Sequence, residues 1–267
     1  MKINVACGSS FSRGWINIDF SPSSSEVRQV NMLHGLPFAD NSCDVIYASH
    51  FLEHLTPDMA EYFLRESFRV LRVGGRIRIV VPDLEEICAA YLKYRQSNLH
   101  KFADFVAVEL IDQCVRMKSG GRLGQTYQKI QGSGDVEMID FVYQRTGYNL
   151  GEVCLKRTSL REKLMSLSWG KLKSILLQMY FRTVSLLLPK SIRDQMVSTT
   201  MIGEKHLWVY DFKMLSDLLT SVGFTDIQKM KFNQSGIEDF HNDGLDQDAH
   251  GNPRKGNESM YVEAIKK

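Results

Sequence analysis

Two features near the start of the chain have the residue types of a nucleotide site. The small-residue turn Ala6-Cys7-Gly8-Ser9-Ser10 follows a strand-like segment, and Asp19 ends the next such segment. Small residues let the backbone approach a ligand, and a carboxylate accepts hydrogen bonds from ribose hydroxyls. Neither a dinucleotide fingerprint nor a P-loop fits, because the required glycine spacing and the Gly-Lys-Ser/Thr ending are missing. A tight turn and an Asp that ends a strand are the purely structural interpretation.

The segment His50-Phe51-Leu52-Glu53-His54 carries a second set of reactive residue types. H-x-x-E-H is also the inverted zinc-peptidase signature, in which two histidines of one helix hold the metal. Here the segment directly follows a strand-like run and precedes Pro57, which leaves too little room for a long active-site helix. We therefore expect no metal, expect Glu53 and His54 to brace the loop, and take His50 as the first candidate for a base.

Two further residues could take part in proton transfer or substrate placement. His206 follows a long helical stretch and is the second candidate base, with a buried ring bonded to the backbone as the alternative. Asp83 follows Pro82 and the run 77–81, which is apolar except for Arg78 and typical of a buried parallel strand, and could orient a substrate hydroxyl.

Short strand-like and helix-like segments alternate around these residues, a pattern that indicates an α/β domain with a parallel sheet. Thr56-Pro57 is expected to begin a helix and Gly74-Gly75 to end it. From about residue 84 to residue 201 helical periodicity replaces the strands, which predicts a helical insertion. The expected strands are 3–6, 15–18, 27–32, 44–48, 77–81, 225–232 and 259–265, with a helix over 211–222.

Several motifs in a fixed order carry a family resemblance. The early ones are I-N-V-A-C-G (3–8), W-I-N-I-D (15–19), L-P-F-A-D-N-S-C-D-V-I-Y-A-S-H-F-L-E-H-L (36–55) and V-L-R-V-G-G-R-I-R-I-V-V-P-D (70–83). Together they resemble the class I S-adenosylmethionine-dependent methyltransferases, in particular a small-molecule branch. The late motifs H-L-W-V-Y-D (206–211), V-G-F-T-D-I (222–227) and S-M-Y-V-E-A-I-K (259–266) are similar to the ends of predicted methyltransferases encoded beside polysaccharide genes.

The resemblance implies S-adenosylmethionine as cofactor and assigns positions to it. In the family the glycine loop lies under the methionine and ribose parts, and the acid that ends strand two binds the ribose hydroxyls. Asn31 stands where the family usually has an Asp that meets the adenine amine, and Met32 or Leu33 would pack on the ring. The predicted cofactor-binding residues are Asn4, Ala6, Cys7, Gly8, Asp19, Asn31, Met32, Ser49 and His50.

The charge of the helical insertion is uneven. Residues 155–193 contain nine basic residues and one acid, whereas the whole chain has a net charge of +2. With leucines and Trp169 at helical spacing, this segment is typical either of a cap whose apolar face covers the substrate cleft or of a helix on an anionic membrane. We favour the cap. Flotation with anionic vesicles distinguishes the two, and the membrane alternative would suit a lipid-linked saccharide acceptor.

The amino-acid composition restricts the class of protein. The chain has 267 residues of which 43% are apolar, enough for a sizeable core, and its overall charge gives no reason to expect nucleic acid as a partner. Five cysteines without a C-x-x-C pair predict reduced thiols in a cytoplasmic protein, with membrane-peripheral contact only through 155–193. The sequence does not indicate an oligomeric state.

We therefore expect an α/β, Rossmann-like class I methyltransferase with a mostly parallel sheet, an antiparallel last strand and a helical insertion. Residues 1–85 and 206–267 are predicted to form the cofactor-binding core, and 86–205 the cap over the substrate cleft. The expected reaction is methyl transfer to an oxygen or nitrogen of a small-molecule or saccharide acceptor. The alternatives are a catalytically silent cofactor-binding regulator and, less favoured, a zinc hydrolase.

Overall fold

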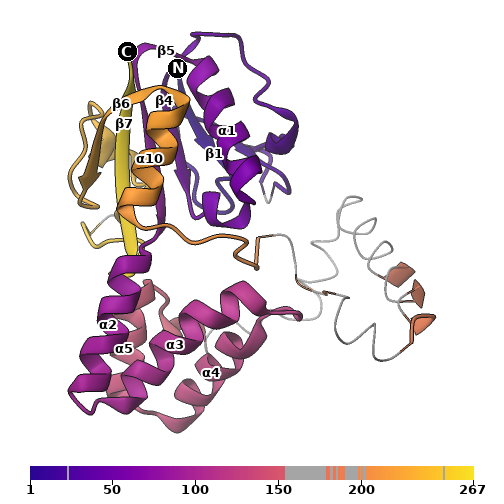
Figure 1. Cartoon of the computed structure of the whole chain (residues 1–267), viewed down its shortest axis with the longest axis vertical. Coiled ribbons are helices and arrows are strands. Elements are labelled where there is room, and N and C mark those ends of the chain that lie inside the picture. Colours follow the sequence, from indigo (N-terminus) through magenta and orange to yellow (C-terminus); the bar gives the residue numbers. More distant parts are fainter. Residues whose placement is uncertain are drawn as a thin grey trace.

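The computed structural model contains a seven-stranded sheet with a lobe of helices at one end of it (Figure 1). It describes residues 1–22, 24–153, 203–248 and 250–267, with a few isolated residues between 179 and 200. The strand order is β3-β2-β1-β4-β5-β7-β6. The strands are β1 (Lys2–Val5), β2 (Ile16–Asp19), β3 (Arg28–Gln29), β4 (Cys43–Ser49), β5 (Leu71–Pro82), β6 (Phe224–Met230) and β7 (Ser259–Lys266).

The sheet is parallel except at its last strand. Neighbouring strands from β3 through β5 pair in parallel, whereas β7 pairs antiparallel with both β5 and β6. This arrangement confirms the predicted fold class, a Rossmann-like sheet with an antiparallel last strand. Because the carboxyl ends of parallel strands meet at one edge, the segments that follow β1, β2, β4 and β5 lie near one another there.

Two helices cover one face of the sheet. Helix α1 (Pro57–Val70) begins at Thr56, whose side chain accepts a hydrogen bond from the Met59 amide, and has Pro57 at its first position, as expected. Helix α10 (Phe212–Val222) is capped in the same way by Asp211. Their apolar sides pack on the sheet and form the main core, in which Phe63, Leu64, Leu215 and Leu219 are almost fully buried (Figure 1).

The predicted end of α1 at Gly74-Gly75 is wrong. The helix ends at Val70, and Leu71 already pairs with Cys43 as the first residue of β5. Leu71 is fully buried, so its place in the core takes the chain directly from helix to strand. The two glycines lie inside β5, beside a register shift in its pairing with β4, and Gly74 has a φ of +79° there.

Among the described residues, no α-helix connects β1 to β2 or β2 to β3. This agrees with the short gap between Gly8 and Asp19. The loop 231–258, with its 3-10 helix η3 (Phe240–Asp243), packs on the opposite face of the sheet instead. Arg78 of β5, which is fully buried, donates hydrogen bonds to Asp246 of this loop at 2.6 Å and to Glu263 of β7 at 2.7 Å. A buried ion-pair network therefore holds the loop to the sheet.

The helical lobe begins where β5 ends. Asp83 caps the amino end of α2, accepting from the Glu85 and Glu86 amides, and its carboxylate pairs with Lys229 at 2.5 Å. Asp83 therefore has structural contacts to α2 and β6, and its role in orienting a substrate hydroxyl stays a prediction. The lobe consists of α2 (Leu84–Gln96), α3 (His100–Val115), α4 (Gly121–Ser133), α5 (Val136–Thr146) and α6 (Leu150–Val153) (Figure 1).

The lobe has its own apolar core, built around Phe102, Phe105, Met138 and Val142. Most of the basic segment 155–193 lies outside the described residues, as does Cys154. The predicted cap or membrane contact of that segment therefore stays a prediction. Among the described residues, no helix is both long enough and apolar enough to cross a membrane.

Candidate functional site

The turn after β1 is shaped for close approach of a ligand. Ala6 and Gly8 have φ values of +52° and +54°, a region that L side chains rarely adopt. A Cβ atom placed on Gly8 would meet nothing within 4 Å, so there is open space in front of the turn. Asn4 does not face that space. Its side-chain amide donates to the Ser10 carbonyl and to Asn17 Oδ1, both at 3.0 Å, and so fixes the shape of the turn.

Asp19 lies beside this turn, as predicted. Its Oδ2 accepts a hydrogen bond from the Gly8 amide at 2.9 Å, and its Oδ1 accepts one from the Ser21 amide at 2.8 Å. A carboxylate has about four acceptor positions, so both oxygens can accept another donor. Burial, with a contribution from the charge of Asp19, raises the pKa of the Cys7 thiol to about 11. The thiol of Cys7, in the turn after β1, is therefore neutral at pH 7.

The residues after β3 differ from the expectation in one respect. Asn31 caps the 3-10 helix η1 (Met32–His34), with its side chain accepting from the Leu33 amide at 3.1 Å. Met32 is turned into the main core and is 4% exposed, whereas Leu33 is 42% exposed. Because the core holds Met32, Leu33 is the residue of this pair that can lie against a ligand ring.

At the end of β4, Ser49 is half-buried and His50 has a φ of +50°. The His50 ring lies between two elements. Its Nδ1 is 3.1 Å from Glu53 Oε1, and its Nε2 is 3.0 Å from the Ser259 hydroxyl, which itself donates to Glu258 Oε1 at 3.0 Å. Burial, with a contribution from the charge of Lys255, lowers the pKa of His50, so its ring is neutral at pH 7 and can accept a proton.

A pocket of about 200 Å³ lies between the sheet edge and the helical lobe. Both candidate bases, His50 and His206, line it. The lobe contributes Glu109, Tyr127 and Tyr148, and the two tyrosine rings stack with centroids 5.1 Å apart. A larger cavity of about 570 Å³ lies at Met1, Lys2 and Gly74 and contains none of the predicted site residues.

Two buried carboxyls of the pocket were not predicted from the sequence. Glu109 Oε2 pairs with Arg145 at 2.5 Å, while Glu109 Oε1 and Glu258 Oε2 have no hydrogen-bond partner among the described residues. Burial raises the pKa of Glu109 to about 7, against the opposing effect of Arg145, and that of Glu258 to about 8. Nothing in the local sequence marks either residue, because their burial depends on the packing of the lobe on the sheet.

The raised pKa of Glu258 predicts a pH-dependent stability. Its ordinary value is 4.5, and the folded chain holds the proton up to about 8, so the stabilisation is complete below 4.5 and is lost as pH rises through 8. Between pH 5 and pH 8 we expect the free energy of unfolding of the wild type to fall by about 3 to 4 kcal/mol relative to that of Glu258→Gln. Urea unfolding at both pH values measures this difference. The exposed Glu238→Gln is the control, and parallel pH curves for wild type and Glu258→Gln would contradict the assignment.

His206 lies in the pocket wall, and no hydrogen bond from its ring to the backbone is seen among the described residues. Its ring is 7% exposed and makes an edge-to-face contact with His54, with the ring centroids 5.0 Å apart. Burial lowers its pKa to about 4, partly offset by the charge of Glu53. Burial opposes ionisation of Glu53 as well, but His50 and the other histidines outweigh it and hold the pKa of that carboxyl at about 2.

The H-x-x-E-H segment does not form the helix of a zinc peptidase. His50 follows β4 directly, and Leu52–His54 form a single 3-10 turn, η2. This agrees with the short helical stretch expected from the sequence. Glu53 does more than brace the loop, however: it is completely buried beside His50, His54 and the pocket.

The amino-acid sequence of the first part of the sheet matches a known protein family. Residues 6–79, which run from the turn after β1 into β5, match the sequence model of a methyltransferase domain. The matched part of the chain is a methyltransferase domain. Both the match over residues 6–79 and the antiparallel last strand of the sheet agree with the methyltransferase resemblance of the sequence motifs. No curated protein matches the chain.

Solved structures of methyltransferases resemble the domain at low identity. One from Thermotoga maritima, described as an S-adenosylmethionine-dependent methyltransferase and possible histamine N-methyltransferase, has 13% identity and a TM-score of 0.40, covering 100% of this chain and 81% of its own. One from Methanosarcina mazei has 15% identity and a TM-score of 0.42, covering 99% and 91%. One from Archaeoglobus fulgidus has 11% identity and a TM-score of 0.40, covering 99% and 85%. These values are too low to indicate an acceptor.

The methyltransferase domain takes S-adenosylmethionine as its methyl donor, and the residues at the sheet edge fit that molecule. The open space at Gly8 admits the ligand to the turn, and Asp19 has acceptor positions to spare for ribose hydroxyls. His50 lies at the end of β4 and also in the pocket wall. The predicted donor site and the pocket therefore adjoin at this residue.

Proposed function

We propose that this methyltransferase transfers the methyl group to an oxygen or nitrogen of a small-molecule or saccharide acceptor that binds in the 200 Å³ pocket. The observation that carries the proposal is the position of His50, which ends β4 beside the predicted donor site and lines the pocket. S-adenosylmethionine supplies an activated methyl group when bound. The chain has to align the acceptor with it and remove the acceptor proton.

His50 is arranged for that proton. The negative charge of Glu53, 3.1 Å from Nδ1, favours a proton on Nδ1 and leaves the lone pair on Nε2. Nε2 can take the acceptor proton directly, or through the Ser259 hydroxyl, 3.0 Å away, once that hydroxyl turns from Glu258 and donates to Nε2. The acceptor oxygen or nitrogen forms its bond to the methyl carbon while the bond from sulfur to that carbon breaks. The proton stays on His50 until solvent removes it.

Labelled methyl transfer tests the proposal. We would incubate the full chain with methyl-labelled S-adenosylmethionine and a panel of hydroxyl-bearing and amine-bearing small molecules and saccharides, and expect label in at least one acceptor. Binding of S-adenosylhomocysteine without transfer to any acceptor of the panel would favour the alternative, a catalytically silent cofactor-binding regulator.

Replacing Asp19 is the expected test of the donor site. Asp19→Ala removes the acceptors proposed for the ribose hydroxyls, and we expect the affinity for S-adenosylhomocysteine to fall by about 5- to 150-fold, or about 1 to 3 kcal/mol. Titration calorimetry measures the loss. Asp217→Ala, which removes an exposed carboxylate of α10, is the matched control. An affinity within twofold of wild type for Asp19→Ala would mean that Asp19 holds only the turn.

Other expectations from the sequence remain proposals. We propose a cytoplasmic protein whose residues 86–205 form the acceptor-side cap, with the core in 1–85 and 206–267. For the basic segment 155–193 we propose a place in that cap, with contact to an anionic membrane and a lipid-linked saccharide acceptor as the alternative. We propose no nucleic-acid partner. His206, in the pocket wall, is the second candidate base.

A further inference from the structure

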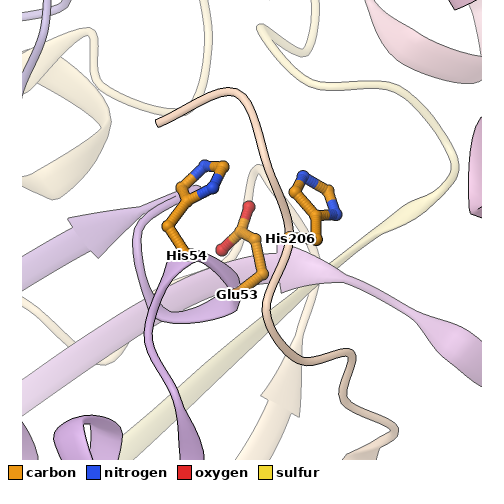
Figure 2. Close-up of side chains that lie close together, drawn as sticks. All are labelled: Glu53, His54 and His206. Carbon is orange, nitrogen blue, oxygen red and sulfur yellow. The ribbon is translucent and has the colours of Figure 1, made fainter. Parts of the chain in front are cut away.

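Glu53, His54 and His206 form a compact cluster at the edge of the acceptor pocket. One ligand atom of each residue lies within 4.8 Å of the others. Figure 2 shows the Glu53 carboxylate directed between the rings of His54 and His206. The residues come from two distant parts of the chain, the 3-10 turn η2 and the segment that leads into α10.

Backbone hydrogen bonds hold the two segments together. The Glu53 carbonyl accepts from the Leu207 amide at 2.7 Å and from the Trp208 amide at 3.2 Å. The His206 amide donates to the Gln113 carbonyl of α3 at 2.9 Å. These bonds hold the backbone of the two segments together before any ligand binds, as a preorganised binding site requires.

The Glu53 carboxylate lacks the partners that a buried charge needs. It is 0% exposed, and its one close polar contact in the described part of the chain is His50 Nδ1, 3.1 Å from Oε1. Oε2 has no partner among the described residues. No described lysine or arginine lies within ion-pair distance of Glu53, and Lys255 of the pocket wall reaches it only through space. A buried carboxylate in such surroundings is costly unless a cation binds it.

His54 is oriented as a ligand. A carbonyl oxygen can only accept, so the 2.9 Å contact between His54 Nδ1 and the Lys205 carbonyl means that Nδ1 carries the proton. The lone pair of His54 is then on Nε2. Histidines that bind metals commonly donate their other ring N–H to a carbonyl in this way, which fixes the tautomer and the ring plane.

We propose that Glu53, His54 and His206 bind a divalent cation, with Zn²⁺ the best match to the donor set. Two imidazoles and one carboxylate are the ligands of open zinc sites, which keep a fourth position for water or substrate. His206 also lines the acceptor pocket, so the proposed cation site adjoins that pocket. The H-x-x-E-H spacing pairs His50 with His54 as the two histidine ligands. The proposed site instead pairs His54 with His206, which the fold brings close from beyond the helical lobe.

Metal content tests the site without reference to methyl transfer. Tag-free full-length protein would be stripped with a chelator, given Zn²⁺, passed through a desalting column and analysed by mass spectrometry of the metal. We expect about one Zn²⁺ per chain in the wild type, a more than fivefold loss in Glu53→Gln and in His206→Ala, and retention in His241→Ala, which removes an exposed histidine. His50→Gln should also retain the metal, because His50 is not among the ligands.

Two further measurements test the metal site: the absorption spectrum of bound Co²⁺ and the binding of S-adenosylhomocysteine. Co²⁺ in place of Zn²⁺ should give the intense visible absorption of tetrahedral coordination in the wild type, a measurement that needs no variant. Binding of S-adenosylhomocysteine reports whether each variant is folded. Wild-type protein that retains little Zn²⁺, or a folded His206→Ala that retains as much as wild type, would overturn the site. Neither result would bear on the proposed methyl transfer, because the labelled-methyl assay tests that separately.

Discussion

His50→Gln is expected to lower kcat for methyl transfer by about 100- to 10,000-fold, the usual contribution of a well-placed general base. Glutamine keeps much of the size of the ring and a hydrogen-bonding end, but it cannot take a proton. The loss should appear in kcat because the acceptor proton is removed only in the reaction. The rates would be measured with an acceptor identified by label transfer, at saturating concentrations of both substrates.

Two measurements separate this role from a structural one. The affinity for S-adenosylhomocysteine should stay within about threefold of wild type, since most of the proposed donor contacts are at Gly8 and Asp19. His241→Gln, which replaces an exposed histidine of η3, should leave kcat unchanged. An unchanged kcat in His50→Gln would exclude His50 as the base, and His206 could take that role only if it does not bind the proposed Zn²⁺. A loss confined to cofactor affinity would make His50 a wall of the donor site only.

The parts of the structure that depend on short local patterns could be predicted from the sequence. The turn at 6–10, the acid at Asp19, the cap at Thr56-Pro57 and the last strand all lie as expected. Each is determined by residues within a few positions of itself, such as a β-branched run or a side chain that caps a helix. The order of these segments was also sufficient to indicate the family.

What could not be predicted depends on contacts between distant segments. Glu53 looked like a brace for its own loop, but its surroundings include His206, which approaches it only because the chain returns from the helical lobe. Glu109 and Glu258 are unremarkable in the sequence, and the fold brings them from α3 and from the residue before β7 into one pocket. Met32 was expected on a ligand ring, and the apolar core holds it instead.

Arg78 is the clearest case, because an arginine inside the run Ile77–Val81 gives no local sign of its partners. Its Nε donates to Asp246 and its Nη1 to Glu263, while its other guanidinium hydrogens reach the Gln234 and Lys231 carbonyls at 3.0 and 3.1 Å. The guanidinium also lies over the Phe240 ring, 4.9 Å from its centroid. All the loop partners of Arg78 come from residues 231–246, so one side chain attaches this loop to the sheet.

Arg78→Met is therefore expected to lower the free energy of unfolding by about 3 to 5 kcal/mol, as measured by urea unfolding. Methionine fills part of the volume but leaves Asp246 and Glu263, both about 1% exposed, without their buried cation. Arg72→Met is the matched control, because Arg72 pairs with Asp44 at the surface and is 58% exposed, so its loss should cost less than about 1 kcal/mol. If both variants lose the same small amount, the buried network does not hold the loop. If only Arg78→Met is destabilised, the loop that leads to Lys255 and Glu258 is fixed from the far face of the sheet, and the acceptor pocket depends on a contact that none of its own residues makes.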